Sequence, residues 1–169
     1  MALNHFGVCD VSENALVKEM DTRSPRNPRE DGSWGTTTEA LVNSFKNRGF
    51  NVTSSFDTQK SNGKSFDSSL ELSKFIKSKL KENSVILVEN VEFGGHWRVI
   101  VGYDDMGIPD DTTSHVLVFA DPYDTNYHDQ NGYTFGSVRR FMGEWFDHDV
   151  VPANQSIQQY VCISKKTEN

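Results

Sequence analysis

The stretch GGHWRVIVGYDD, residues Gly94–Asp105, combines a strand pattern with a histidine at its entrance. From residue 96 onward apolar residues recur at every second position, which predicts a β-strand over residues 96–103. The segment HVLVFA, His115–Ala120, predicts a second strand, and the connection between the two is rich in Gly, Pro and Asp, as turns are. We therefore expect residues 96–103 and 114–121 to pair as an antiparallel hairpin.

This hairpin brings two complementary side chains to one end of the sheet. In the simplest register His96 stands opposite Asp121, although a slip of one residue would put Asp121 on the other face. An imidazole beside a carboxylate is the base-and-orienter half of a nucleophilic triad, because the carboxylate fixes the ring tautomer and stabilises the imidazolium. Pairing geometry alone favours a structural interpretation, with His96 as a strand-end residue and Asp121 as a turn initiator before Pro122, because His–Asp pairs are common structural contacts.

The rest of the chain predicts an α+β fold, because helices come first and strands follow with a helix between them. Apolar spacing and capping residues predict four helices. These are residues 13–20 after Ser12, a helix with a capping box at Thr36 and Glu39 that stops at Gly49, a helix with a capping box at Ser68 and Glu71 that runs to Leu80, and Val138–Trp145. Two more strands are predicted, Val85–Val88 at the centre of the sheet and Tyr160–Ile163 at an edge.

Composition narrows the class of protein. The 169 residues suit one domain, 1–169, with a helical part over 1–50 and a mainly sheet part over 84–165. The formal net charge of -7 argues against nucleic acid or an anionic membrane as the main partner. No signal peptide and no membrane-spanning segment is visible, and the two cysteines are too few for a disulfide framework. We expect a cytoplasmic protein with free thiols.

No cofactor or metal site is predicted. The acidic segment Asp124–Asp129 hints at a calcium loop, but an EF-hand needs Gly and Glu where this chain has Asp129 and Phe135. His128, Asp147, His148 and Asp149 have no spacing that requires a metal, and charged loop residues usually face water.

The motifs resemble those of papain-like cysteine peptidases of the bacteriocin-processing type, whose best-known bacterial members cleave double-glycine leaders. The resemblance rests on GGHWRVIVGYDD and VLVFADPYD, and it continues upstream in VSENALVKEM and GTTTEALVNSFKNRGFNV and downstream in RRFMGEWFD. It covers most of the chain in the family's order. It implies a papain-like fold, a peptide or protein substrate, His96 as the catalytic base and Asp121 as the orienting acid.

The same resemblance leaves the nucleophile unassigned. The family's nucleophile opens the first helix in a Cys-Gly-Pro motif, preceded by a Gln that stabilises the oxyanion, and no Cys-Gly-Pro occurs in this sequence. Residues 1–6 look like the last turns of that helix, with Gly7 as its stop, so the motif is expected upstream of Met1. Cys9 follows the helix rather than opening it, and we expect it to be a half-buried structural residue. Cys162 is expected in the core.

Two hypotheses follow. In the first, the native protein is an enzyme that carries the Cys-Gly-Pro helix ahead of Met1. In the second, the chain is a catalytically inactive peptidase-like module whose groove binds a peptide. In both, residues 1–169 alone are expected to show no peptidase turnover. Loss of the catalytic helix is also expected to expose apolar surface and to favour self-association.

Overall fold

The computed structural model describes residues 1–90, 95–122, 131–147 and 156–166. Within these residues the chain forms six helices and six strands. The helices are α1 (Ala2–His5), α2 (Glu13–Glu19), α3 (Thr38–Asn47), α4 (Ser55–Thr58), α5 (Ser69–Lys81) and α6 (Val138–Glu144). The strands are β1 (Asn51–Ser54), β2 (Val85–Asn90), β3 (His96–Asp104), β4 (Val116–Ala120), β5 (Tyr133–Ser137) and β6 (Tyr160–Ser164).

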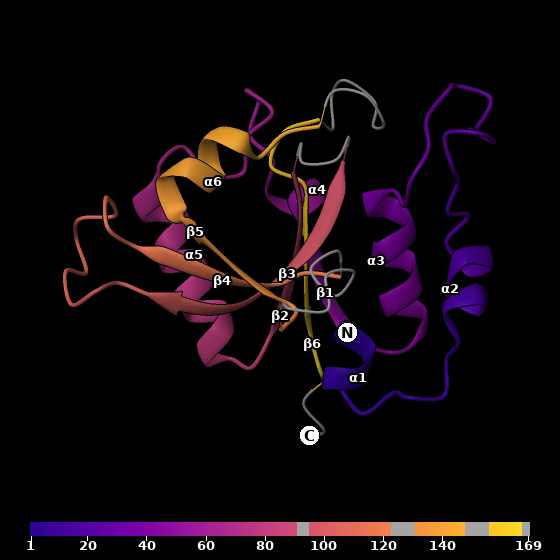
Figure 1. Cartoon of the computed structure of the whole chain (residues 1–169), viewed down its shortest axis with the longest axis horizontal. Helices are drawn as coiled ribbons and strands as arrows, with labels where there is room; N and C mark the ends of the chain where they lie inside the picture. Colours follow the sequence, from indigo (N-terminus) through magenta and orange to yellow (C-terminus); the bar gives the residue numbers. More distant parts are fainter. Residues whose placement is uncertain (91–94, 123–130, 148–155, 167–169) are drawn as a thin grey trace.

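The strands form one antiparallel sheet in the order β1-β6-β2-β3-β4-β5, so the α+β prediction is confirmed. The α1 and α3 helices lie on one side of the sheet and α5 and α6 on the other (Figure 1). Alternation along β2 shows this division, since Leu87 packs with α1 and α3 while Ile86 and Val88 pack with α5 and α6. Each such side chain stabilises the fold by about 1.5–3 kcal/mol when fully buried.

The capping residues determine where the helices begin, and the predicted cap of one helix is wrong. Ser12 and Ser68 cap α2 and α5 as predicted, each accepting a hydrogen bond from a backbone N–H three residues on. The prediction of Thr36 as the cap of α3 is wrong, because Thr37 accepts the hydrogen bond from the Ala40 N–H at 3.2 Å. The Thr36 hydroxyl is instead bonded to Thr22, at 2.7 Å.

The strand predictions also need correction at one edge. Residues 85–88 are central as predicted, but Tyr160–Ile163 belongs to β6, which lies between β1 and β2 rather than at an edge. Its Tyr-Val-Cys-Ile segment is apolar on both faces and is buried throughout. The edges are β1 and β5, which the sequence patterns did not predict; β1 is largely polar, and no residue of β5 is buried.

The hairpin of β3 and β4 forms, but the predicted register is wrong. Val99 pairs with Ala120 and Ile100 with Phe119, so continuation of the ladder sets position 98, not His96, opposite Asp121. The difference is two residues, and side chains alternate with a period of two, so His96 stays on the same face as Asp121. A bulge between Ile100 and Gly102 shifts the ladder by one more residue at the far end of the hairpin.

Candidate active site

His96 and Asp121 meet at the end of the sheet where β3 begins and β4 ends. The Nε2 atom of His96 lies 2.7 Å from Oδ1 of Asp121. His96 is 5% exposed and Asp121 is 4% exposed, so the contact is shielded from water. The Asp121 N–H donates to the carbonyl of Gly132 at 3.0 Å, which fixes the backbone beyond β4.

This contact selects a tautomer of the neutral imidazole. A carboxylate only accepts hydrogen bonds, so Nε2 carries the proton and donates it to Asp121. The lone pair then resides on Nδ1, and a second proton would enter there. The arrangement can therefore accept a proton at Nδ1 while Asp121 stabilises the resulting imidazolium.

Arg98 is a third polar residue at this end of the sheet, and it was not among the residues predicted from the sequence. It lies two residues after His96 and is buried on the same face of β3, with Nη1 4.0 Å from Oδ2 of Asp121. Its guanidinium group stacks on the ring of Phe119, 4.2 Å from the centroid. The alternation of β3 was the available signal, because a residue two positions from a site residue shares its face.

Trp97 anchors the start of β3 from the opposite face. Its indole Nε1–H donates to the carbonyl of Thr36 at 2.9 Å, just before α3 begins. Trp97 also packs against the core between the sheet and α1 and α3. The backbone that presents His96 is therefore tied to the helical layer.

The two cysteines are in different environments, and neither belongs to this pair. Cys9 is exposed, so the prediction that it is half-buried is wrong. It lies in the loop between α1 and α2, at the lower edge of the molecule in Figure 1, whereas β3 begins at the upper edge. Cys162 is buried in β6 as predicted, and burial raises the pKa of its thiol to about 11, which disfavours the nucleophilic thiolate.

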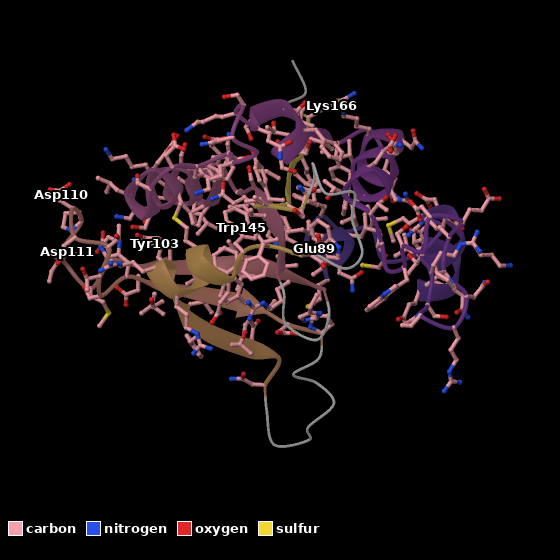
Figure 2. All side chains as sticks on the ribbon, turned by 90° about the horizontal axis from the view of Figure 1, so that it is seen from above. Glu89, Tyr103, Asp110, Asp111, Trp145 and Lys166 are labelled. Atoms are coloured by element: carbon pink, nitrogen blue, oxygen red, sulfur yellow. The ribbon has the colours of Figure 1, made fainter. Side chains whose placement is uncertain are left out.

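A second buried histidine, His115, has contacts that are typical of a structural role. His115 is fully buried just before β4, with Nδ1 bonded to the hydroxyl of Tyr103 and Nε2 donating to the carbonyl of Ile108 at 2.7 Å. Figure 2 shows Tyr103 at the same end of the molecule as Asp110 and Asp111, away from Glu89 and Trp145. Both ring nitrogens of His115 are engaged within the hairpin, and no carboxylate contacts them among the described residues.

A groove of about 370 Å³ lies beside α1, and its lining includes Met1, His5, Val99 and Ala120. Neither His96 nor Asp121 lines it. The groove reaches the strand pair β3–β4 through Val99 and Ala120, whose side chains lie on the α1 side of the sheet, opposite to the face that carries His96 and Asp121.

Several residues considered as metal ligands, namely His128, His148 and Asp149, lie outside the described residues, as does the acidic segment 124–129. Within the described residues, no three His, Cys, Asp or Glu side chains gather as a cluster suited to a metal ion.

A comparison with protein families matches the model described as "Peptidase_C39 like family" over residues 1–146. The chain belongs to the Peptidase_C39-like family. The match spans α1 to α6 and contains both His96 and Asp121. Comparisons with curated proteins and with solved structures gave no match.

Membership of the Peptidase_C39-like family agrees with the architecture. The six helices and the antiparallel six-stranded sheet within the described residues are those of an α+β, papain-like fold. None of the described helices is both long and apolar enough to cross a membrane.

Proposed function

We propose that this chain is the larger part of a single cysteine-peptidase domain in which His96 is the base and Asp121 orients it. The observation that carries the proposal is the buried 2.7 Å contact between His96 Nε2 and Asp121 Oδ1 in a Peptidase_C39-like chain. The nucleophile is assigned to a Cys-Gly-Pro segment ahead of Met1. The α1 helix, which ends before Gly7 in the left-handed region (φ 84°), fits the last turn of the helix that would carry it.

The proposed mechanism is acyl transfer to a thiol. The resting pair is a thiolate and a His96 imidazolium protonated at Nδ1. The thiolate attacks the peptide carbonyl carbon, and the negative charge moves to the oxygen, where upstream Gln and backbone N–H groups stabilise it. The intermediate collapses as His96 gives its Nδ1 proton to the leaving amine. Water then attacks the thioester, His96 takes its proton, and the acid and the thiolate are released.

The supporting residues have defined tasks in this mechanism. Asp121 keeps Nδ1 directed toward the reaction, because its carboxylate occupies the other side of the ring. Arg98 places a positive charge 4.0 Å from the second oxygen of Asp121. The substrate class is a peptide or protein, and we propose a cytoplasmic location without a resident metal or cofactor.

The alternative is a peptidase-like module that binds a peptide without cleaving it. The observation that favours it is that neither cysteine of residues 1–169 belongs to the His96–Asp121 pair. Under either proposal residues 1–169 show no peptidase turnover by themselves. Turnover that is abolished by Cys9→Ala would contradict both.

The intact mass of the native protein from its source, with its N-terminal peptide sequenced, separates these proposals. The enzyme proposal expects a longer product that contains a Cys-Gly-Pro peptide. A product that begins at Met1 or Ala2 would support the binding module, and binding of peptides to the chain would then be measured by calorimetry.

A further inference from the structure

Two carboxyl side chains, Glu89 and Asp147, are buried against each other at the end of β2. Glu89 is 3% exposed and Asp147 is 2% exposed, and the two side chains lie within hydrogen-bonding reach of each other. Ionised carboxylates only accept hydrogen bonds, so one of the two must be protonated to donate. The pair can therefore be joined by a shared proton, as adjacent carboxyls are elsewhere.

Main-chain hydrogen bonds hold the two residues in place. The Asp147 N–H donates to the Ser156 carbonyl at 2.8 Å, and the Glu89 N–H donates to the Gln159 carbonyl at 3.1 Å. The indole of Trp145 donates to the same Gln159 carbonyl at 3.0 Å. These bonds tie the segment after α6 to the end of β2, and Figure 2 shows Glu89 and Trp145 in the same part of the molecule. Repulsion between two carboxylates here would oppose this attachment.

The surroundings of Glu89 disfavour a negative charge on its side chain. Burial and the charge of Asp147 raise the pKa of Glu89 to about 8. The Oε2 atom of Glu89 has no hydrogen-bond partner among the described residues. The basic side chains of the neighbouring elements contact other groups: Arg98 of β3 with Phe119 and Asp121, His96 of β3 with Asp121, Lys77 of α5 with Asp105, and Arg140 of α6 with Glu144.

We propose that Glu89 and Asp147 form a proton-dependent clasp that holds the segment after α6 against the end of β2, and that loss of the shared proton loosens this end of the sheet. The clasp acts in the fold itself and does not depend on whether the domain hydrolyses peptides. Its effect would reach the candidate site, because Glu89 pairs with Trp97, the neighbour of His96 in β3.

The sign of the pH dependence follows from the pKa of Glu89. Its ordinary value is 4.5, and in the folded chain it is raised to about 8. The folded state then binds more protons than the unfolded state between these values, so stability falls as pH rises. The contribution of the clasp is complete below about pH 4.5 and is lost as pH rises through about 8.

Thermal unfolding of the chain and of Glu89→Gln, measured from pH 5 to pH 9, tests the clasp. The amide can donate to Asp147 without titrating, so the variant imitates the protonated pair. We expect the midpoint of the wild type to fall relative to that of Glu89→Gln by more than about 3 °C across this range. Glu144→Gln on α6 is the matched control and should follow the wild type. Equal pH dependence in wild type and Glu89→Gln would overturn the proposal.

If Glu89→Gln does not fold, two further measurements test the proton-dependent clasp. Carbon-13 NMR of the glutamate-labelled wild-type chain should show one carboxyl that titrates near pH 8, and titration of every glutamate near 4.5 would overturn the proposal. Calcium or magnesium added at pH 8 should leave the midpoint unchanged. A rise in the midpoint that a chelator reverses would mean that a cation, not a proton, joins the carboxyls.

Discussion

Two buried histidines of this chain differ in what their ring nitrogens contact, and this difference separates a candidate base from a structural residue. His115 contacts a tyrosine hydroxyl and a backbone carbonyl within its own hairpin. His96 contacts the carboxylate of Asp121, which directly follows the next strand. A carboxylate stabilises the charge that the imidazole acquires when it takes a proton more strongly than a neutral hydroxyl or carbonyl does.

The contact between His96 and Asp121 predicts the tautomer of the neutral ring. We expect the proton of neutral His96 on Nε2, because Asp121 Oδ1 lies 2.7 Å from that atom. Long-range proton–nitrogen NMR of the histidine rings distinguishes the two tautomers directly. Asp121→Ala should reduce this preference, and a wild-type signal from the Nδ1–H tautomer would contradict the assigned geometry.

At the scale of elements, the hairpin of β3 and β4 shows which features the sequence predicts and which it does not. Alternation along residues 96–103 predicted the strand and its faces, and these hold. The register depends on the bulge between Ile100 and Gly102, which periodicity alone does not reveal. His96 and Asp121 were nevertheless predicted as neighbours, because an error of two residues keeps each side chain on its face.

Other elements were missed for different physical reasons. The β5 strand was missed because its strand-favouring pattern covers only Tyr133, Thr134 and Phe135 before Gly136 interrupts it. The four-residue helix α4 is too short for a helical period to appear, although Asp57 closes a capping box with Ser54. Arg98 was missed because its proximity to Asp121 depends on the same register.

Close packing at Gly102 offers a test of the bulge. A Cβ atom at this position would lie 3.1 Å from Cβ of Val118 on the neighbouring strand. We expect Gly102→Ala to lower the free energy of unfolding by about 1–3 kcal/mol, measured by urea denaturation. Gly143→Ala in α6 is the control, because nothing lies within 4 Å of its Cβ position and alanine favours helices by about 0.5–1 kcal/mol. Equal stability of Gly102→Ala and the wild type would contradict the described packing.

At the scale of the whole molecule, the two thiols report on folding. Cys9 is exposed, whereas Cys162 is buried in β6 with its pKa raised to about 11. We expect a thiol reagent at pH 8 to modify one cysteine per folded chain and both in denaturant, counted by mass spectrometry. Cys9→Ser should leave the folded chain unreactive. Rapid modification of Cys162 without denaturant would show that the sheet opens near β6.

Exposed apolar side chains predict self-association. Phe135 on the edge strand β5 is 71% exposed, and Val101 and Tyr133 are also exposed. Exposed apolar side chains on an edge strand favour contact with another chain. We expect sedimentation velocity to show a concentration-dependent increase in mass that Phe135→Ser weakens. Val17→Ser on α2 is the control for removal of an exposed apolar residue. A single monomeric species at all concentrations would contradict this expectation.

The catalytic role of His96 is tested by the rate of peptide hydrolysis by the native protein and its His96→Gln variant. We expect kcat/KM to fall by about 10²- to 10⁴-fold, because general acid–base catalysis contributes that much. His115→Gln, the same substitution at the structural histidine, controls for altered packing when rates are expressed per folded molecule. An unchanged kcat/KM in His96→Gln would contradict the proposed mechanism and leave the His96–Asp121 pair as a structural contact.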